Sequence, residues 1–299
     1  MIPETAPLAG APLWLRITAH LPLPLLYLIC RAASWSALHI FGWRRRVVRG
    51  NLRGCFPDWD EGQLRRATDA HYRQVGEMIA EVLRGARLDA AELTRRVLVQ
   101  DADLPRRLLA AGRPVLMVGP HQANWEWVLQ VLSLQLGYPL DVGYKPIKSR
   151  GVDLAMNRIR QRFGAHLVPA KELLADLLQR RHIVRGIAML ADQEPVTSDH
   201  KHWLTFLGRD TAFYLGPEQM ARATRYAAVF VAMRRLRRGY YEAQFLPLSA
   251  AGETLAPGEF TARYARLVEA EIRAAPSDWT WGHRRWKLKR GLYSGQEAG

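Results

Sequence analysis

Short apolar runs alternate with amphipathic segments over most of the chain. Pro114–Val118 and Gly186–Leu190 are uninterrupted apolar runs of strand length, and each is followed by residues typical of a turn. Between them, Lys171–Arg181 repeats leucine at a spacing that places the leucines on one face of a helix. Continuous apolar strands are typical of a parallel sheet that is buried on both faces. The pattern therefore predicts an α/β core with a mostly parallel central sheet flanked by helices.

The remaining predicted elements follow the same alternation. A turn at Pro57-Asp58 precedes a helix that Asp58 or Asp60 can cap and that runs to about Leu83. Further strands are predicted at Asp141–Tyr144, near His166–Val168, at Ala227–Met233 and at Tyr240–Leu246, and further helices at Val152–Phe163, Pro217–Thr224 and Pro257–Ala274. No internal repeat or Gly/Ser-rich linker interrupts the sequence. We therefore expect residues 44–299 to form one domain.

The N-terminal region is unusually apolar. From Ile17 to Trp43 the only charged residue is Arg31, and Pro22 and Pro24 interrupt the start of the run. At about 1.5 Å per residue such a run is long enough to cross roughly 30 Å of hydrocarbon. A signal peptide is disfavoured because no small-residue cleavage site follows the apolar stretch. We expect residues 1–43 to be an N-terminal membrane-anchor helix that either spans the membrane or lies half-buried in it; a buried core helix is the alternative.

Positive charge follows the apolar run directly. The cluster consists of Arg44, Arg45, Arg46, Arg49 and Arg53. By the positive-inside rule these arginines stay on the cytoplasmic side, where they can also bind anionic headgroups. This orientation predicts a single N-terminal membrane anchor with the remaining chain in the cytoplasm.

The whole chain is basic, with 43 Lys+Arg against 28 Asp+Glu and a formal charge of +15. Such a balance suggests an anionic partner, although arginine can also serve simply as a solvated charge. Two further clusters mix arginine with aromatic residues: Arg234, Arg235, Arg237 and Arg238, and then Arg284, Arg285, Lys287, Lys289 and Arg290 near Trp281 and Trp286. Such clusters suit nucleic acid or a membrane interface. Beside an apolar anchor we favour an anionic membrane surface and expect no nucleic acid partner.

Few residues are arranged like metal ligands. Cys30 and Cys55 are too few for a zinc site or a disulfide framework, which favours a reducing compartment. Asp199-His200-Lys201-His202 contains a possible ligand pair, but further acidic or cysteine partners do not cluster nearby. We therefore interpret that segment as an exposed loop and expect no metal site.

His121 lies at the predicted carboxyl end of a strand, in the segment GPHQANWEW, and Glu126 comes five residues later. In open α/β sheets, ligand sites lie just beyond the carboxyl ends of the strands. Within one helix, five residues at about 100° each would put the two side chains roughly 140° apart. We therefore expect His121 in the loop and Glu126 in the first turn of the next helix, with its carboxylate turned back toward the imidazole.

This arrangement predicts a catalytic pair. A carboxylate that holds one ring nitrogen of histidine leaves the other nitrogen free to act as a general base. The first helical turn also favours negative charge, which helps to keep Glu126 ionised. A loop histidine followed by a glutamate at a helix start is also commonplace without any catalytic role, so this pair does not by itself decide the function.

Several segments together carry a family resemblance. GPHQANWEW resembles the His-x4-Glu/Asp motif of the glycerolipid acyltransferase superfamily, specifically its lipid A (Kdo2-lipid A late acyltransferase) branch. Five further blocks resemble that branch in the same order, from about residue 44 to 290: NLRGCFPDWD, YKPIKSRGVDLAMNRIRQRFGAHLVP, LADQEP, WLTFLGRDTAFYLGPEQMARAT and WTWGHRRWKLKR. The sequence departs from the usual pattern at Lys145, where arginine is more common, and at Leu207, where a second phenylalanine is typical.

The resemblance implies a glycerolipid-acyltransferase-like fold and transfer of a fatty acyl group. The donor would be acyl carrier protein or coenzyme A, and the acceptor a hydroxyl of a membrane glycolipid, specifically a lipid A precursor. His121 would deprotonate that hydroxyl and Glu126 would support the imidazolium, without a cofactor or a metal ion.

The same resemblance assigns substrate-binding roles. Arg160 and Arg162 match the family's Arg-x-Arg pair, which could hold an acceptor phosphate or stabilise the oxyanion. Asp192 and Gln193 match the block after a later strand and would line the same cleft. Two alternatives remain: the same chemistry on another glycolipid or an aminolipid, and a basic membrane-binding protein without activity.

Overall fold

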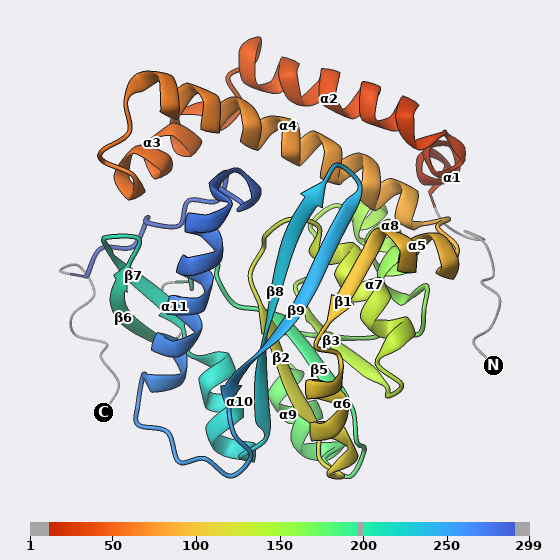
Figure 1. Cartoon of the computed structure of the whole chain (residues 1–299), viewed down its shortest axis with the longest axis vertical. Helices are drawn as coiled ribbons and strands as arrows, with labels where there is room; N and C mark the ends of the chain where they lie inside the picture. The colour runs from red at the N-terminus through yellow and green to blue at the C-terminus, as the bar shows by residue number, and fades with distance from the viewer. Residues whose placement is uncertain (1–11, 197–199, 291–299) are drawn as a thin grey trace.

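The structure is a computed structural model that describes residues 12–196 and 200–290. Its sheet contains seven strands: β1 (Val97–Gln100), β2 (Val115–Gly119), β3 (Leu140–Tyr144), β4 (His166–Pro169), β5 (Gly186–Leu190), β8 (Ala227–Arg237) and β9 (Tyr240–Ser249). The strands lie in the order β1-β9-β8-β2-β5-β3-β4 (Figure 1). From β8 to β4 all neighbours are parallel, whereas β9 is antiparallel to β8 and β1 is parallel to β9. The mostly parallel central sheet is thereby confirmed.

Helices cover both faces of this sheet. Leu116 and Val118 of β2 belong to one hydrophobic core, whereas Val115 and Met117 belong to the other, as the alternation of side chains along a strand requires. The first core includes residues of α3 (Arg45–Cys55), α9 (Leu173–Gln179), α10 (Gly216–Thr224) and α11 (Glu259–Ala274); the second includes residues of α2 (Leu23–His39), α5 (Ala90–Arg96), α6 (Asp103–Ala110) and α7 (Trp125–Gln135).

One long helix, α4 (Glu61–Gly85), contributes residues to both cores and runs across the top of the sheet in Figure 1. It begins as the sequence predicts, because the Asp60 side chain accepts a hydrogen bond from the backbone N–H of Gln63, and the Gln63 side chain accepts one from Asp60 in return. Helix α8 (Arg150–Gln161) packs against its C-terminal half.

A two-stranded hairpin lies outside the main sheet. It consists of β6 (Lys201–Phe206) and β7 (Arg209–Tyr214). The exposed loop predicted around Asp199–His202 is therefore wrong from Lys201 onward, where the chain is a strand, while Asp199 lies outside the described residues. The short helix η1 (Pro276–Asp278) follows α11 and leads into the tryptophan-rich C-terminal segment.

The apolar N-terminal run does not form one continuous helix. It is divided into α1 (Leu13–His20) and α2, which are bent by 120° at a break that contains Pro22, and Pro24 lies in the first turn of α2. Proline fixes its own backbone angle and lacks an N–H, so it begins a helix more readily than it continues one. Within the described ranges, no single helix is long and apolar enough to cross a membrane, and only this bent pair passes the test of length and composition.

Helix α2 packs against α4 along one side and leaves apolar side chains uncovered on the other. Leu26 and Tyr27 are buried in the core, whereas Leu28 and Trp35 are 67% and 58% exposed. Arg31, the one charge within the run, pairs with Glu77 of α4 at 3.7 Å. A groove of about 730 Å³ lies beside α2; its lining includes Tyr27, Arg31, Trp35, Tyr72, Arg73 and Arg238.

Candidate active site

The candidate site forms where two neighbouring parallel strands end. β2 and β5 are paired so that Gly119 lies opposite Leu190. Two residues beyond each of these positions stand His121 and Asp192. The register of the sheet therefore brings together two residues that are 71 positions apart in the sequence. This is the position just beyond the carboxyl ends of the strands that the sequence predicts for His121.

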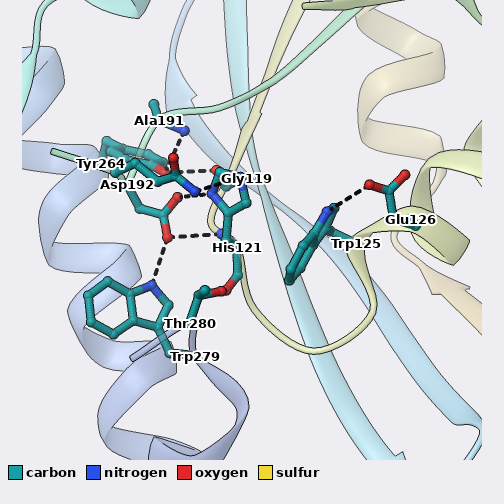
Figure 2. A network of polar contacts seen from close by, with 10 residues as sticks. Gly119, His121, Trp125, Glu126, Ala191, Asp192, Tyr264, Trp279 and Thr280 are labelled. Carbon is teal, nitrogen blue, oxygen red and sulfur yellow. Dashed lines mark hydrogen bonds and ion pairs between the residues drawn. The ribbon is translucent and has the colours of Figure 1, made fainter. Parts of the chain in front are cut away.

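Asp192 binds both the backbone N–H and the imidazole ring of His121. The backbone N–H of His121 donates to Asp192 Oδ2 at 2.9 Å, and His121 Nδ1 lies 2.6 Å from Asp192 Oδ1 (Figure 2). Because a carboxylate is an acceptor only, Nδ1 is the protonated ring nitrogen in the neutral imidazole, and Nε2 carries the lone pair. The side chain of Asp192 is 1% exposed and that of His121 is 21% exposed, so the histidine faces outward from a buried carboxylate.

The surroundings of Asp192 favour its charged form. Burial by itself would raise the pKa of this carboxyl, but the positive charge of His121 and hydrogen bonds from His121 and Trp279 lower it below the ordinary aspartate value. Trp279 Nε1 donates to Oδ2 at 2.7 Å. The result is a buried anion that fixes the orientation of the imidazole through Nδ1.

Helix α11 and the C-terminal segment hold the strand ends in place. The hydroxyl of Tyr264 donates to the carbonyl of Gly119 at 2.8 Å and accepts from the backbone N–H of Ala191 at 3.3 Å. Thr280 donates its hydroxyl to the carbonyl of His121 at 2.7 Å. Figure 2 shows these residues on the same side of His121 as Asp192.

Glu126 does not contact His121 in the way the sequence suggests. Helix α7 begins at Trp125, so Glu126 lies in its first turn as predicted. Its carboxylate, however, accepts hydrogen bonds from Trp125 Nε1 at 3.1 Å and from Arg160 at 2.6 and 2.9 Å. The indole of Trp125 lies between the two residues, with its ring edge-on to the imidazole at 5.1 Å (Figure 2). The carboxylate beside the imidazole is that of Asp192.

The two arginines assigned to substrate binding have different surroundings. Arg160 uses Nε and one terminal nitrogen to bind both oxygens of Glu126, and this pair is largely buried. Arg162 instead donates to the backbone carbonyls of Leu88 and Ala86, at 3.0 and 2.7 Å, next to the end of α4. Arg160 therefore contacts a residue of the predicted site, Glu126. Arg162 instead connects the end of α8 to the segment between α4 and α5.

Gln193 lies next to His121 Nε2, the ring nitrogen that carries the lone pair. Its Nε2 lies 3.3 Å from His121 Nε2, and its side chain is exposed. An amide N–H in this position donates to the unprotonated ring nitrogen. A hydroxyl in the same place would be within reach of a general base. Gln193 thus lies beside His121 Nε2.

The basic clusters are only partly available to a surface partner. Arg234 pairs with Glu271, Arg235 pairs with Glu77, and Arg285 is buried with its guanidinium 4.4 Å from the ring of Phe213. Burial lowers the pKa of Arg285 to about 10. Arg235 and Arg285 are thus turned inward, whereas Arg234 keeps 45% of its side chain exposed beside Glu271.

The contacts of Asp192, Tyr264 and Trp279 were not predicted from the sequence. The strand-end rule puts Asp192, like His121, at the carboxyl edge of the sheet, but only the pairing of β2 with β5 makes the two residues neighbours. Tyr264 lies inside an amphipathic helix, and its sequence position gives no sign of its hydroxyl's partners. In the described part of the chain, no group of three or more His, Cys, Asp or Glu residues could hold a metal ion.

Comparisons with known proteins identify the family of the chain. The chain resembles lipid A biosynthesis palmitoleoyltransferase of Escherichia coli strain K12, with 22% identity over 279 residues that cover 93% of this chain and 89% of the relative. It resembles lipid A biosynthesis lauroyltransferase of the same strain, with 26% identity over 281 residues and the same coverage of each chain. A model of the family described as bacterial lipid A biosynthesis acyltransferase matches residues 8–288. The chain therefore belongs to the bacterial lipid A biosynthesis acyltransferase family, and it is an acyltransferase.

Proposed function

We propose that this protein transfers a fatty acyl chain from acyl carrier protein to a hydroxyl of a lipid A precursor, with His121 as the general base. Coenzyme A is the alternative donor. The observation that carries the proposal is the pairing of His121 with the buried Asp192 at the carboxyl end of β2, in a chain that belongs to a lipid A acyltransferase family.

The first step is removal of the hydroxyl proton. His121 Nε2 accepts the proton of the acceptor hydroxyl, because Nδ1 is held in its protonated form by Asp192. The imidazole then carries a positive charge, 2.6 Å from a carboxylate that is almost fully buried. That short contact stabilises the charge as it develops, which is when stabilisation increases the rate.

The second step is direct attack on the thioester. The acceptor oxygen forms a bond to the acyl carbonyl carbon, and the bond between that carbon and the sulfur of the donor breaks. The proton held by His121 passes to the departing thiolate, so that the imidazole returns to its neutral form. The products are an ester on the glycolipid and the free thiol of the carrier, and no side-chain nucleophile of this chain is required.

Arg160 and Glu126 act together in this proposal. Glu126 fixes the guanidinium of Arg160 by two hydrogen bonds, and Trp125 contacts both Glu126 and the imidazole. A guanidinium held by Glu126, on the far side of Trp125 from His121, suits the phosphate of the acceptor or the oxyanion of the transition state. Glu126 thus supports the reaction through Arg160, and Gln193 borders the hydroxyl position.

Helix α2 provides the membrane-facing surface in this proposal. Its exposed apolar side, with Leu28 and Trp35, lies next to a groove that Arg31, Arg73 and Arg238 help to line. Apolar and aromatic side chains beside arginine suit the boundary between hydrocarbon and anionic headgroups. We therefore propose that residues 1–43 form an anchor that holds the enzyme at the inner membrane, with the active site on the cytoplasmic side.

The proposal is tested by product analysis with the full-length protein in detergent micelles. The protein is incubated with labelled acyl carrier protein, or acyl coenzyme A in a parallel arm, and a tetra-acylated or penta-acylated lipid A precursor. The expected result is a precursor whose mass increases by one acyl chain, formed by the wild type and not by His121→Ala. Product formed only on glycerolipids or aminolipids would contradict the proposal that the acceptor is a lipid A precursor. Absence of product on every acceptor would contradict the proposed acyl transfer.

A further inference from the structure

The loop that carries His121 has an uncommon backbone conformation. Ala123, two residues after His121, has a φ of 52°, which is the left-handed region that side chains other than glycine rarely adopt. Such a residue persists only where the surrounding structure holds it. One contact is the hydrogen bond from the Ala123 backbone N–H to the carbonyl of Asp278 at 2.9 Å. The next residue, Asn124, makes two further hydrogen bonds that hold the loop.

Asn124 uses both ends of its side-chain amide. Its Oδ1 accepts a hydrogen bond from the backbone N–H of Trp127 at 3.0 Å and so caps helix α7. Its Nδ2 donates to Glu81 Oε2 at 2.8 Å. The side chain is fully buried. Asn124 therefore connects the start of α7 to a carboxylate that lies outside the site, on α4.

Glu81 accepts hydrogen bonds from three neutral side chains. Besides Asn124, the hydroxyl of Tyr27 donates to Oε1 at 2.7 Å, and the hydroxyl of Tyr241 donates to Oε2 at 2.5 Å. In addition, Trp127 Nε1 donates to the backbone carbonyl of Glu81 at 2.9 Å. The donors come from α2, β9, the catalytic loop and α7, and Glu81 itself is 0% exposed.

A carboxylate suits this position better than its amide isostere. Its two oxygens accept all three donors at once, whereas an amide whose oxygen takes the Oε2 position keeps the hydrogen bonds from Asn124 and Tyr241 and turns its NH2 group toward the Tyr27 hydroxyl. Burial raises the pKa of Glu81, against the opposing effect of the hydrogen bonds from both tyrosines and Asn124 and the charge of Arg235. Because all three of its donors are neutral, the Glu81 carboxylate fixes the positions of Tyr27, Asn124 and Tyr241 through hydrogen bonds.

We propose that Glu81 is a positioning residue, which holds the His121 loop in its reactive geometry through Asn124. The proposal rests on the proposed function, because it assigns to Glu81 an effect on the rate of acyl transfer. It also predicts an effect on the loop itself that does not depend on any activity. Tyr27 joins helix α2 to the same carboxylate, so the N-terminal helix and the catalytic loop share one buried contact.

The test compares Glu81→Leu, the conservative variant Glu81→Gln, and Glu218→Leu as a matched control. Leucine at position 81 removes the acceptor of Asn124, whereas glutamine retains it because its oxygen takes the Oε2 position. Glu218 is also buried and also accepts from neutral donors, namely the backbone N–H of Gly258 and the N–H and hydroxyl of Thr261. The full-length protein is used throughout, and thermal unfolding is measured for each variant.

Two readouts are measured. The first is hydrogen exchange of the peptide that contains residues 119–126, where Glu81→Leu should speed exchange of the Ala123 amide by about tenfold or more, the effect of losing one hydrogen bond to a charged group. The second is acyl transfer, where Glu81→Leu should lower kcat by about tenfold and leave KM for the acyl donor within about twofold. Glu81→Gln should retain most of the wild-type exchange protection and kcat, and Glu218→Leu should change neither.

The outcomes separate positioning from general stability. If Glu81→Leu and Glu218→Leu lower the unfolding temperature and kcat equally, or if Glu81→Gln loses as much kcat as Glu81→Leu, the proposal is wrong. If Glu81→Leu fails to fold, Tyr27→Phe deletes one hydroxyl of the same contact and is expected to speed exchange of the Ala123 amide by a smaller factor; unchanged exchange in that variant contradicts the proposal. Absence of acyl transfer in the wild type would refute the proposed function alone, because hydrogen exchange still reports on the loop.

Discussion

Asp192→Asn is the substitution that distinguishes the observed pair most clearly. Asp192 Oδ2 accepts from the His121 backbone N–H and from Trp279 Nε1, whereas Oδ1 accepts only from His121 Nδ1. An asparagine keeps more hydrogen bonds if its oxygen takes the Oδ2 position. Its NH2 group then faces His121 Nδ1, which must become the acceptor. The ring proton moves to Nε2, and the lone pair no longer faces the substrate.

The expected loss of activity follows from this change of tautomer. Carboxylate-to-amide substitution behind a catalytic histidine lowers kcat by about 10³- to 10⁴-fold in comparable sites, or roughly 4–5 kcal/mol in the barrier. The assay is the initial rate of acyl transfer from labelled acyl carrier protein at saturating acceptor, on a sample whose folding is verified by circular dichroism. A folded variant with kcat within about tenfold of the wild type would refute the reasoning, because a tautomer change cannot be so mild.

A matched variant and a pH series sharpen the test. Trp279→Phe removes one donor to Oδ2 and leaves the tautomer of His121 unchanged, so its loss in kcat should be much smaller than that of Asp192→Asn. The lowered pKa of Asp192 means that its charge stabilises the folded state above the ordinary aspartate value of 3.8, and that this contribution is lost as the pH falls below it. The difference in unfolding free energy between wild type and Asp192→Asn should therefore narrow below about pH 4.

Three further predictions follow from individual contacts. Glu126→Gln should lower kcat by about 10- to 10²-fold, less than Asp192→Asn, because Glu126 binds Arg160 and not the imidazole; an equal loss in steady-state assays would instead favour direct support of His121. His71 is buried and its pKa is lowered to about 4, mainly by burial, so the unfolded state binds more protons as the pH falls from 6.5 to 4. Between pH 6.5 and 4 this lowers the unfolding free energy of the wild type by about 3 kcal/mol, and His71→Gln should abolish that decrease, as measured by urea unfolding against pH. Arg162→Gln should lower the unfolding free energy by about 1–2 kcal/mol in the same assay, because two backbone carbonyls lose their donor.

The sequence predicted the sheet well because buried parallel strands are continuous apolar runs. Gly186–Leu190 is predicted to the residue, and the predicted run at Pro114–Val118 overlaps β2 almost completely. The same signal placed His121 at the carboxyl end of a strand. The order of strands in the sheet is a property of tertiary packing, and the apolar pattern along the chain carries little information about it.

The partner of His121 depended on that missing information. Glu126 is five residues away in sequence and Asp192 is 71 residues away, so local spacing favoured Glu126. Only the pairing of β2 with β5 brings Asp192 to the imidazole. Trp125 adds a second reason, because its indole lies between His121 and Glu126 and its own N–H binds that carboxylate.

The N-terminal run shows the same limit in another form. Its composition fits a spanning helix, a bent pair of helices and a helix packed on a core equally well. Pro22 and Pro24 signal the break, but the side of α2 that is covered depends on contacts far along the chain. Tyr27 is turned inward by Glu81 of α4, and Leu28 beside it is left exposed.

The central claim is that His121 and Asp192 act as one catalytic unit, and a double-variant cycle tests it most directly. The measurement is kcat for acyl transfer to the lipid A precursor by the wild type, His121→Ala, Asp192→Asn and the double variant, each verified as folded. If the two residues act as a unit, the double variant loses about as much as His121→Ala alone, because removing the base leaves Asp192 nothing to orient. Losses that multiply in the double variant would show that the two residues act independently and would contradict the account.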